Sequence, residues 1–338
     1  MILLTGGAGY IGSHTLLELF KTDREVVLLD NFSNSDKSVI QKLEKITNKK
    51  ITLLEVDICD FSTLQQSLKK FPITSVIHFA AKKAVGESVQ SPILYYENNV
   101  GGLINILKIC AEKNILNFVF SSSCTVYGIP NSSPVTEDFP IQIANSPYGN
   151  TKQIGEEILN DYKIANPNFK YFNLRYFNPI GAHESGLIGD NPNGIPNNLL
   201  PYLTKVVFGE LKELTVFGGD YNTADGTCIR DYIHVVDLAR AHVLALETLE
   251  KSEKDLPKSI NLGTGVGYSV LDVISTFEKT TQKKVAYKIG PKREGDVPAI
   301  YANATLAKEI LSLPLYPGMP QEFQDQVVSL ILKFFGGK

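Results

Sequence analysis

The sequence is poor in cysteine and in long apolar segments, and neither sign of charge predominates. Its 338 residues include four cysteines, none in a CxxC or similar spacing, so we expect neither a disulfide framework nor a bound metal. The longest apolar runs, such as 2–4 and 26–29, have the length of strands and cannot span a bilayer. Lysine and arginine number 33 against 36 acidic residues, a net charge of −3, which gives no basic surface for nucleic acid or an anionic membrane. We therefore expect a cytoplasmic protein with neither of these partners.

Apolar material is sufficient for a large core, because 43% of the residues are hydrophobic. Continuous apolar strands are predicted at 2–5, 25–30, 51–57, 75–79 and 117–121, and helical patterns at 10–20, 61–70 and 98–113. Uninterrupted apolar strands that alternate with helices are typical of a parallel sheet covered on both faces. The sequence therefore predicts an α/β fold with a Rossmann-type doubly wound parallel sheet.

The strand-helix alternation blurs after residue 178, where proline and glycine become frequent. At this length about two domains are expected, so we place the first over residues 1–178 and a smaller, looser α/β domain over residues 179–338. We expect the second to pack over the carboxyl edge of the sheet. The segment 231–250 has a strand-then-helix pattern and could return to the first domain. A last helix is predicted at 320–335.

A glycine-rich turn, TGGAGYIG over residues 5–12, lies between the first predicted strand and the first predicted helix. Its glycines, Gly6, Gly9 and Gly12, allow a tight turn and a close approach of the backbone to a pyrophosphate. The helix that follows would present free N–H groups and the positive end of its dipole to the anion. Glycines also occur in turns that bind nothing, but this position between strand and helix favours a dinucleotide site.

Two aspartates end the next two predicted strands. Asp30 lies 18 residues after Gly12, where a carboxylate would accept hydrogen bonds from the ribose hydroxyls of a dinucleotide. Its charge would repel a 2′-phosphate, which favours NAD over NADP; in the alternative reading Asp30 only begins a loop. Asp57 has two comparable readings, a contact to adenine or the N-cap of the following helix.

A tyrosine and a lysine lie one helical turn apart in SPYGNTK, residues 146–152. Tyr148 and Lys152 are at positions i and i+4, so they project from the same face of a helix. A nearby ammonium stabilises phenolate, so we expect Lys152 to lower the tyrosine pKa and make Tyr148 a general base toward a substrate hydroxyl. Ser123 leaves the strand predicted at 117–121 at the carboxyl edge, where its hydroxyl could share the same proton.

These motifs together resemble those of the UDP-glucose 4-epimerases (also called UDP-galactose 4-epimerases), which belong to the extended short-chain dehydrogenases/reductases. The resemblance covers almost the whole chain. The stretches that carry it are TGGAGYIGSHT (5–15), 28–35, 78–100, FSSSCTVYG (120–128), SPYGNTK (146–152), 174–183, 194–202, 225–239 and REGDVPA (293–299).

The resemblance implies roles for individual residues. Tyr148 would be the base, Lys152 its electrostatic partner and Ser123 the hydroxyl that handles the proton. NAD would be held by Gly6, Gly9, Tyr10, Ile11, Gly12, Asp30, Asn31, Ser35, Asp57, Ile58, Phe79, Ala80, Lys83, Asn98, Tyr148, Lys152 and Phe177. The UDP-sugar would be held by Ser123, Tyr148, Asn178, Asn198, Leu199, Phe217, Arg230, Arg293, Asp296 and Ile300. The cation of Lys83 suits the cofactor's pyrophosphate, and the two arginines suit a diphosphate because guanidinium groups bind its oxygens in pairs.

The implied activity is that of an isomerase of galactose and nucleotide-sugar metabolism. It would interconvert UDP-glucose and UDP-galactose by transient oxidation at sugar C4, through a 4-keto intermediate and hydride return to the opposite face, with tightly held NAD. The implied assembly is a homodimer in which helices at about 92–113 and 148–165 form a four-helix bundle. The apolar stripe at 98–113 is compatible with this but could equally face the sheet.

Three other activities are considered. Nucleotide-sugar dehydratases usually carry an Asp-Glu pair where this chain has Cys124 and Thr125, and these two residues cannot serve as that acid and base. UDP-glucuronate decarboxylases typically carry a glutamate at the second of these positions, so Thr125 argues against that activity too. A non-catalytic NAD sensor usually lacks the Tyr-Lys pair. Ile300 occupies the position that gates sugar size in the family and is intermediate in bulk, so activity on UDP-GlcNAc and UDP-GalNAc stays open beside the expected preference for UDP-glucose and UDP-galactose.

Overall fold

The larger sheet carries the predicted dinucleotide turn. The computed structural model describes residues 1–293 and 295–311 together with Ser329 and Lys333. In this part of the chain the larger sheet has seven strands in the order β10-β6-β5-β4-β1-β2-β3, all parallel. The strands are β1 (Ile2–Thr5), β2 (Val26–Asp30), β3 (Thr52–Glu55), β4 (Ser75–His78), β5 (Asn117–Ser123), β6 (Lys170–Tyr176) and β10 (Ser259–Leu262). The Rossmann-type α/β prediction is confirmed.

Helices cover both faces of this sheet. Successive residues of a strand point to opposite faces, so each strand contributes apolar side chains to a cluster on either side. Leu4 and Leu28 belong to one apolar cluster, which includes residues of α1 (Tyr10–Phe20) and α9 (Val235–Lys251). Leu3 and Val27 belong to the other, with α3 (Phe61–Leu68), α6 (Gly102–Lys113) and α7 (Pro147–Ala165). The helix α2 (Ser38–Thr47) follows β2 and packs near α1.

The helix predicted at 98–113 has two parts. Its first turns are the π-helix η1 (Tyr96–Gly101), preceded by α4 (Val85–Gln90) and α5 (Pro92–Tyr95), and regular α-helix begins only at Gly102. Asn99 in η1 donates through Nδ2 to the Lys82 carbonyl at 3.0 Å and to Thr151 Oγ1 at 3.0 Å. This segment therefore ties the loop after β4 to the start of α7.

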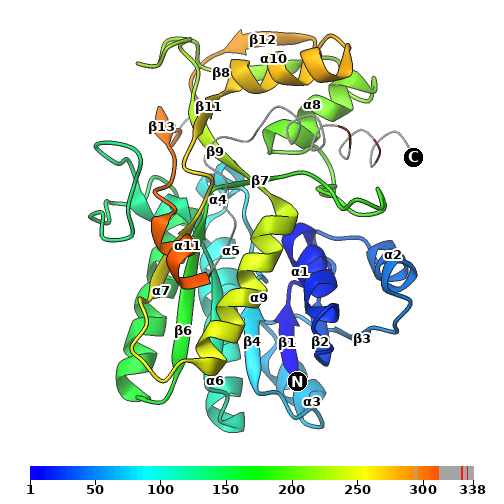
Figure 1. Cartoon of the computed structure of the whole chain (residues 1–338), viewed down its shortest axis with the longest axis vertical. Helices are drawn as coiled ribbons and strands as arrows, with labels where there is room; N and C mark the ends of the chain where they lie inside the picture. The colour runs from blue at the N-terminus through cyan, green and yellow to red at the C-terminus, as the bar shows by residue number, and fades with distance from the viewer. Residues whose placement is uncertain (294, 312–328, 330–332, 334–338) are drawn as a thin grey trace.

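The smaller unit lies beyond the carboxyl ends of the large sheet, above it in Figure 1. In the described part of the chain, its larger sheet is centred on β9 (Ile229–His234), which pairs with β7 (Asn178–Ile180), β11 (Gly267–Ser269) and β13 (Ala299–Ile300). A separate two-stranded parallel sheet is formed by β8 (Leu214–Phe217) and β12 (Tyr287–Gly290). The helices α8 (Leu199–Val207) and α10 (Val270–Thr281) pack beside it, and α11 (Thr305–Leu311) packs against α9.

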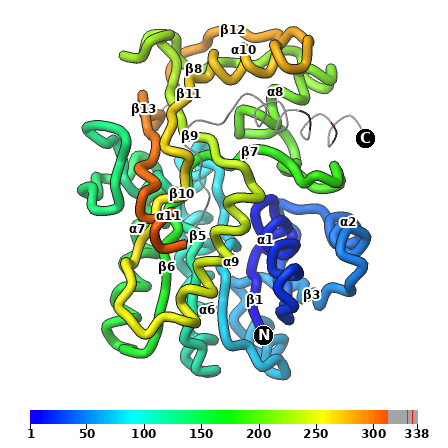
Figure 2. The backbone as a smooth tube through the Cα atoms, viewed as in Figure 1, coloured from blue at the N-terminus to red at the C-terminus, as the bar shows by residue number. Residues whose placement is uncertain are grey.

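Two segments after residue 178 belong to the larger unit. The helix α9 covers most of the segment 231–250, which the sequence indicated could return to the first domain. It packs along α1, and Figure 2 shows these distant parts of the chain side by side. The strand β10 then joins the larger sheet beside β6. The division into domains 1–178 and 179–338 stays a prediction. No helix among the described residues is long and apolar enough to cross a membrane. The helix predicted at 320–335 lies outside the described residues, except Ser329 and Lys333.

Candidate active site

A cavity of about 1120 Å³ lies where the two units meet. Its wall is built from the glycine turn, the ends of the parallel strands, the start of α7 and the smaller sheets. Every predicted site residue lines it except Asp57. The structure therefore brings together residues that are separated by almost the whole sequence, from Gly6 to Ile300.

The glycine turn forms a cradle at the start of α1. Gly6 has φ of +66°, and a side-chain Cβ there would come within 2.7 Å of the Ala80 backbone nitrogen. Gly9 is the N-cap of α1 without a side-chain cap, and the first turn of α1 has no acidic residue. A Cβ on Gly12 would collide with the Gly6 carbonyl. The glycines leave space for a phosphate group beside the backbone. The free N–H groups at the start of α1 provide hydrogen-bond donors and a partial positive charge for it.

Asp30 ends β2 at the edge of the cavity and is 8% exposed. Its carboxylate accepts hydrogen bonds from Ala8 N at 2.9 Å, Phe32 N at 2.9 Å and Ser35 Oγ at 3.1 Å. The aspartate thus fixes the glycine turn and the loop after β2, and it faces the cavity as a ribose-binding carboxylate should. Its contact with a ribose stays a prediction.

The N-cap reading of Asp57 is wrong. The helix α3 is capped by Asp60, which accepts a hydrogen bond from Thr63 N at 3.1 Å. Asp57 instead accepts from Cys59 N at 2.8 Å and from Asn31 Nδ2 at 2.9 Å. Because Asn31 lines the cavity, Asp57 lies directly behind its wall, and the predicted contact with adenine is untested.

The three predicted catalytic residues meet at the floor of the cavity. Ser146 caps α7 by accepting a hydrogen bond from Gly149 N at 3.1 Å, and Pro147 takes the first helical position. This start of the helix turns Tyr148 and Lys152 toward the sheet, where they are 9% and 4% exposed. Ser123 ends β5 and is 7% exposed.

The pKa of Tyr148 is not lowered as expected from the nearby Lys152. Burial raises the pKa of Tyr148 well above its usual value, and a hydrogen bond with the Ser123 hydroxyl opposes this shift only in part. Lys152 Nζ donates to the Ser121 carbonyl at 2.6 Å and lies 6.0 Å from the centroid of the Tyr148 ring. Burial lowers the pKa of Lys152 to about 7. Formation of phenolate therefore requires a further positive charge beside the phenol.

The opposite wall carries the predicted diphosphate-binding arginines. Arg230, on β9, donates through Nη1 to the Val297 carbonyl at 2.6 Å and pairs with Asp296 at 3.4 Å. Arg293 binds the same carboxylate at 2.8 Å and lies 5.6 Å from the centroid of the Phe217 ring. Asp296 thus holds two guanidinium groups beside each other, an arrangement that suits two linked phosphate groups.

The position of Arg230 depends on a neighbouring residue, Asp231, that sequence reasoning did not assign to the site. Asp231 is fully buried, and its carboxylate accepts hydrogen bonds from Thr264 N at 2.8 Å, Gly265 N at 3.0 Å and Ala302 N at 3.1 Å. It does not pair with its neighbour Arg230. The bonds connect β9 to the loop after β10 and to the chain after β13, and they fix the strand that presents Arg230.

Sequence reasoning also missed several polar residues of the cavity wall, among them Asp190 and Tyr176. Asp190, 8% exposed, accepts a hydrogen bond from Asn198 Nδ2 at 2.9 Å and lies 4.0 Å from Lys83 Nζ, so it joins a predicted substrate residue to a predicted cofactor residue. It lies in a proline- and glycine-rich stretch without periodicity. Tyr176 ends β6, and its hydroxyl bonds Ser121 Oγ at 2.5 Å. The rule that ligands bind at the carboxyl ends of parallel strands would have found Tyr176 if β6 had been predicted.

Comparison with known proteins agrees with this arrangement. A protein-family model described as the NAD dependent epimerase/dehydratase family matches residues 2–263. The chain belongs to this epimerase/dehydratase family. Among curated relatives, a UDP-glucose 4-epimerase of Haemophilus influenzae is 50% identical over 325 residues, which are 96% of this chain and 95% of the relative. The UDP-glucose 4-epimerase of Drosophila melanogaster is 46% identical over 330 residues, 96% of this chain and 94% of the relative.

Solved structures of family members share the fold over their full length. The UDP-glucose 4-epimerase of Bifidobacterium longum, in complex with NAD⁺ and UDP, superimposes with a TM-score of 0.93 at 43% identity and covers 100% of this chain and 98% of that one. The UDP-Glc/GlcNAc 4-epimerase of Campylobacter jejuni has a TM-score of 0.80 at 34% identity, with 98% of each chain covered. The predicted resemblance to this family is confirmed.

The cradle fits the family's cofactor. A dinucleotide needs a helix N-terminus without a side-chain cap, space where a Cβ would stand, and a carboxylate at the end of β2, and Gly9, Gly6 and Asp30 supply these. Lys83 adds a cation at the cavity wall. Among the described residues, no group of three or more histidine, cysteine, aspartate or glutamate side chains is placed to hold a metal ion.

Proposed function

We propose that this chain is a UDP-glucose 4-epimerase that interconverts UDP-glucose and UDP-galactose, with NAD as a regenerated cofactor. The observation that carries the proposal is that Tyr148, Ser123 and Lys152 line the same cavity as the glycine cradle and the paired arginines. One cavity thus holds a phenol that could transfer a proton, a turn that suits a dinucleotide and two arginines that suit a diphosphate. The family membership and the relatives of similar length support the same function.

The protein's groups handle the proton at the sugar 4-hydroxyl. When bound, NAD would supply a hydride acceptor at C4 and, in its oxidised form, the positive charge that the phenol requires. Tyr148 would then take the hydroxyl proton as phenolate, and Ser123 would hold the hydroxyl within reach of the phenol oxygen. Lys152, fixed on the Ser121 carbonyl, would keep a second cation below the reacting groups. When hydride would return to the opposite face of C4, Tyr148 would return the proton to the C4 oxygen, which would restore the hydroxyl in the inverted configuration.

Substrate anchoring would fall on the nucleotide. Arg230 and Arg293 provide charge-assisted bonds for the diphosphate, and Asn178, Asn198, Leu199, Phe217 and Asp296 complete this wall. The sugar end of the cavity is bordered by Ile300, which is 4% exposed and makes no polar side-chain contact. Strong bonds to UDP and weak ones to the hexose would let a 4-keto sugar rotate and present its other face to the same hydride donor.

The decisive experiment supplies UDP-galactose to the purified protein and measures UDP-glucose. We expect interconversion without net NADH release, and a Tyr148→Phe variant that retains NAD but is slower by a factor of about 10² to 10⁴. Accumulated NADH would instead indicate a dehydrogenase, a 4-keto-6-deoxy product a dehydratase, and bound NAD without turnover a sensor.

A second candidate substrate pair is UDP-GlcNAc and UDP-GalNAc. Ile300 pairs with Arg230 between β13 and β9 and is less bulky than the tyrosine expected for strict hexose specificity. The Campylobacter jejuni relative, whose name covers both glucose and N-acetylglucosamine forms, shares the fold. We propose UDP-glucose and UDP-galactose as the main substrates; comparable kcat/KM values on the two pairs would reject this preference.

We also propose a homodimer, because α4, α5 and α6 leave apolar side chains in solvent. Val89, Ile93, Leu94 and Ile104 are 44%, 66%, 40% and 39% exposed. The apolar stripe predicted at 98–113 is divided: Leu103 and Leu107 are buried, whereas Ile104 and Ala111 are exposed. An Ile93→Asp variant should sediment as a monomer at micromolar concentration, whereas Ile143→Asp, at a 92% exposed loop position, should not change the mass. An unchanged mass in both variants would reject this interface.

A reducing compartment, the cytoplasm, is part of the same proposal. The four cysteines are all unpaired, and Cys59 is exposed. Fractionation of cells that express the protein would test this, and recovery outside the cytoplasm would reject it.

A further inference from the structure

A buried ion pair lies directly behind the catalytic lysine. Glu156 is one helical turn after Lys152 on α7, and its carboxylate accepts bonds from Arg175 Nε at 2.9 Å and Arg175 Nη2 at 2.6 Å. The two side chains are 11% and 7% exposed. Removing a carboxylate and a guanidinium from water is costly, so a pair of this kind at a catalytic floor requires an explanation beyond stability.

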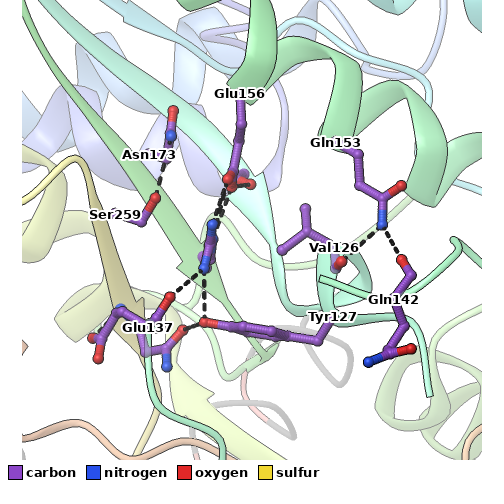
Figure 3. A network of polar contacts seen from close by, with 11 residues as sticks. Val126, Tyr127, Glu137, Gln142, Gln153, Glu156, Asn173 and Ser259 are labelled. Carbon is purple, nitrogen blue, oxygen red and sulfur yellow. Dashed lines mark hydrogen bonds and ion pairs between the residues drawn. The ribbon is translucent and has the colours of Figure 1, made fainter. Parts of the chain in front are cut away.

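The pair is part of a network that spans the end of the sheet. Ser122 Oγ donates to Glu156 Oε1 at 2.5 Å, and Arg175 Nη1 donates to Tyr127 OH at 3.1 Å and to the Glu137 carbonyl at 3.0 Å. Figure 3 shows Glu156 on one side of this network and Tyr127 and Glu137 on the other. None of the residues in this network is predicted to bind NAD or the UDP-sugar.

The network joins the two elements that carry the catalytic groups. Ser122 lies between Ser121, whose carbonyl holds Lys152 Nζ, and Ser123, the predicted partner of the substrate hydroxyl. Because strand residues alternate, the side chain of Ser122 points away from that of Ser123 and reaches Glu156 on α7. The bond from Ser122 to Glu156 therefore fixes the end of β5 relative to the helix that presents Lys152.

The negative charge of Glu156 also favours the protonated form of Lys152. Lys152 forms no ion pair within 4.0 Å in the described part of the chain, and its nearest polar partner is the neutral Ser121 carbonyl. Burial lowers the pKa of Lys152, and the charge of Glu156 is the influence that raises it. Without this carboxylate the amine would more readily lose its proton in its buried position.

We propose that Glu156, held by Arg175 and Ser122, is a positioning residue that keeps Lys152 in place and charged beneath the reacting groups. This inference rests on the proposed epimerase function. Glu156 touches neither the cavity nor the predicted ligands, since it is absent from the cavity wall, and it acts through Lys152. Arg175 in turn orients the Glu156 carboxylate through its two charge-assisted hydrogen bonds.

Among the described groups that face this site, Lys152 has the pKa nearest neutrality, about 7. Other titratable groups recorded around Lys152 and Tyr148 are His78 on β4, Tyr95 on α5, Cys124 in η2 (Cys124–Tyr127) and Tyr176 on β6. Burial lowers the pKa of His78 to about 3 and raises those of Cys124 and Tyr176 to about 12. Burial also raises the pKa of Tyr95 well above its usual value. The fall of kcat at alkaline pH should therefore report Lys152.

The test replaces Glu156 by the uncharged isostere and uses the next residue as its matched control. In Glu156→Gln we expect kcat at pH 8 to fall about tenfold, the KM for UDP-galactose to stay within about twofold, and the alkaline limb of kcat to move about one pH unit lower. Glu157→Gln removes the same charge from an exposed position on the same helix and should leave all three quantities unchanged.

A second variant covers the case in which the unpaired Arg175 prevents folding. The double variant Glu156→Gln/Arg175→Met removes both charges together, which avoids leaving one buried charge without a partner. It should fold and still show the reduced kcat and the shifted alkaline limb. If recovery of the fold also restores parental kcat and its pH profile, the pair is purely structural and the inference is overturned.

These outcomes distinguish the positioning role of Glu156 from the proposed epimerase function. If the parent protein interconverts the UDP-hexoses and Glu156→Gln behaves like Glu157→Gln, the positioning role is rejected while the epimerase function stands. If the parent binds NAD but turns over no UDP-hexose, the proposed function falls, and the role of Lys152 that this inference requires falls with it.

Discussion

Acidification below neutrality should destabilise this protein steeply, because three histidines are buried in their neutral form. His14, His78 and His242 are 2%, 2% and 0% exposed. Burial lowers their pKa values from 6.5 to about 3, 3 and 4. His14 and His242 form hydrogen bonds through Nδ1 to the Tyr10 and Leu238 carbonyls, and neither Nε2 atom has a hydrogen-bond partner among the described residues. The native state cannot readily protonate these rings, whereas the unfolded chain can.

The sign and size of the effect follow from linkage. The folded pKa values lie below the unfolded value, so the contribution to stability is complete above pH 6.5 and is lost as the pH falls toward the folded pKa. Between pH 7.5 and 5.5 each histidine removes about 1.4 kcal/mol, or about 4 kcal/mol for the three. That is a large part of the roughly 5–15 kcal/mol that stabilises a typical domain.

Urea unfolding at pH 7.5, 6.5 and 5.5 would measure this dependence. Near pH 5.5 the unfolded state should bind about 2.7 more protons than the native state at these three sites. A His242→Leu variant should lower this number by about one, whatever its absolute stability. An uptake of fewer than one proton at pH 5.5 in the parent would refute the reasoning.

Three further outcomes concern the cavity. Gly6→Ala should abolish retention of NAD during purification, because its Cβ would meet Ala80 N at 2.7 Å with φ at +66°, whereas Gly101→Ala, with nothing within 4 Å of its Cβ, should retain the cofactor. Asp30→Asn should raise the affinity for NADP relative to NAD about tenfold, because about 1.4 kcal/mol of repulsion of the 2′-phosphate is removed; an unchanged ratio in competition titrations would contradict the ribose contact. Ile300→Ala should raise kcat/KM for UDP-GlcNAc relative to UDP-glucose about tenfold as the sugar end widens, and no change in that ratio would show that Ile300 does not gate sugar size.

The parts of the fold that were predicted from the sequence are those in which burial leaves a local pattern. β1 and β2 read ILLT and VVLLD, apolar on both faces, and both were predicted. β6 and β10 were missed because Asn173, Arg175 and Asn261 interrupt their apolar runs. The partners that allow these polar groups to be buried are distant in sequence: Asn261 accepts a bond from Tyr127, 134 positions away. No local pattern contains that information.

The site shows the same division between local and distant information. The i, i+4 spacing of Tyr148 and Lys152 predicted that they share a helix face, and the structure places both at the cavity floor. The direction of the tyrosine pKa shift was wrong because spacing says nothing about solvent. Burial dominates it, and Lys152 is directed to Ser121 by a contact across 31 positions.

The late position of α9 and β10 along the chain has a consequence during translation. β10, residues 259–262, forms the last strand at the edge of the larger sheet, and α9 covers α1 on one of its faces. A nascent polypeptide that has emerged only as far as residue 178 would leave the β6 edge unpaired and the apolar side of α1 in water. We therefore expect the larger sheet to be completed only after residue 262 has left the ribosome, with the β6 edge open to other strands until then.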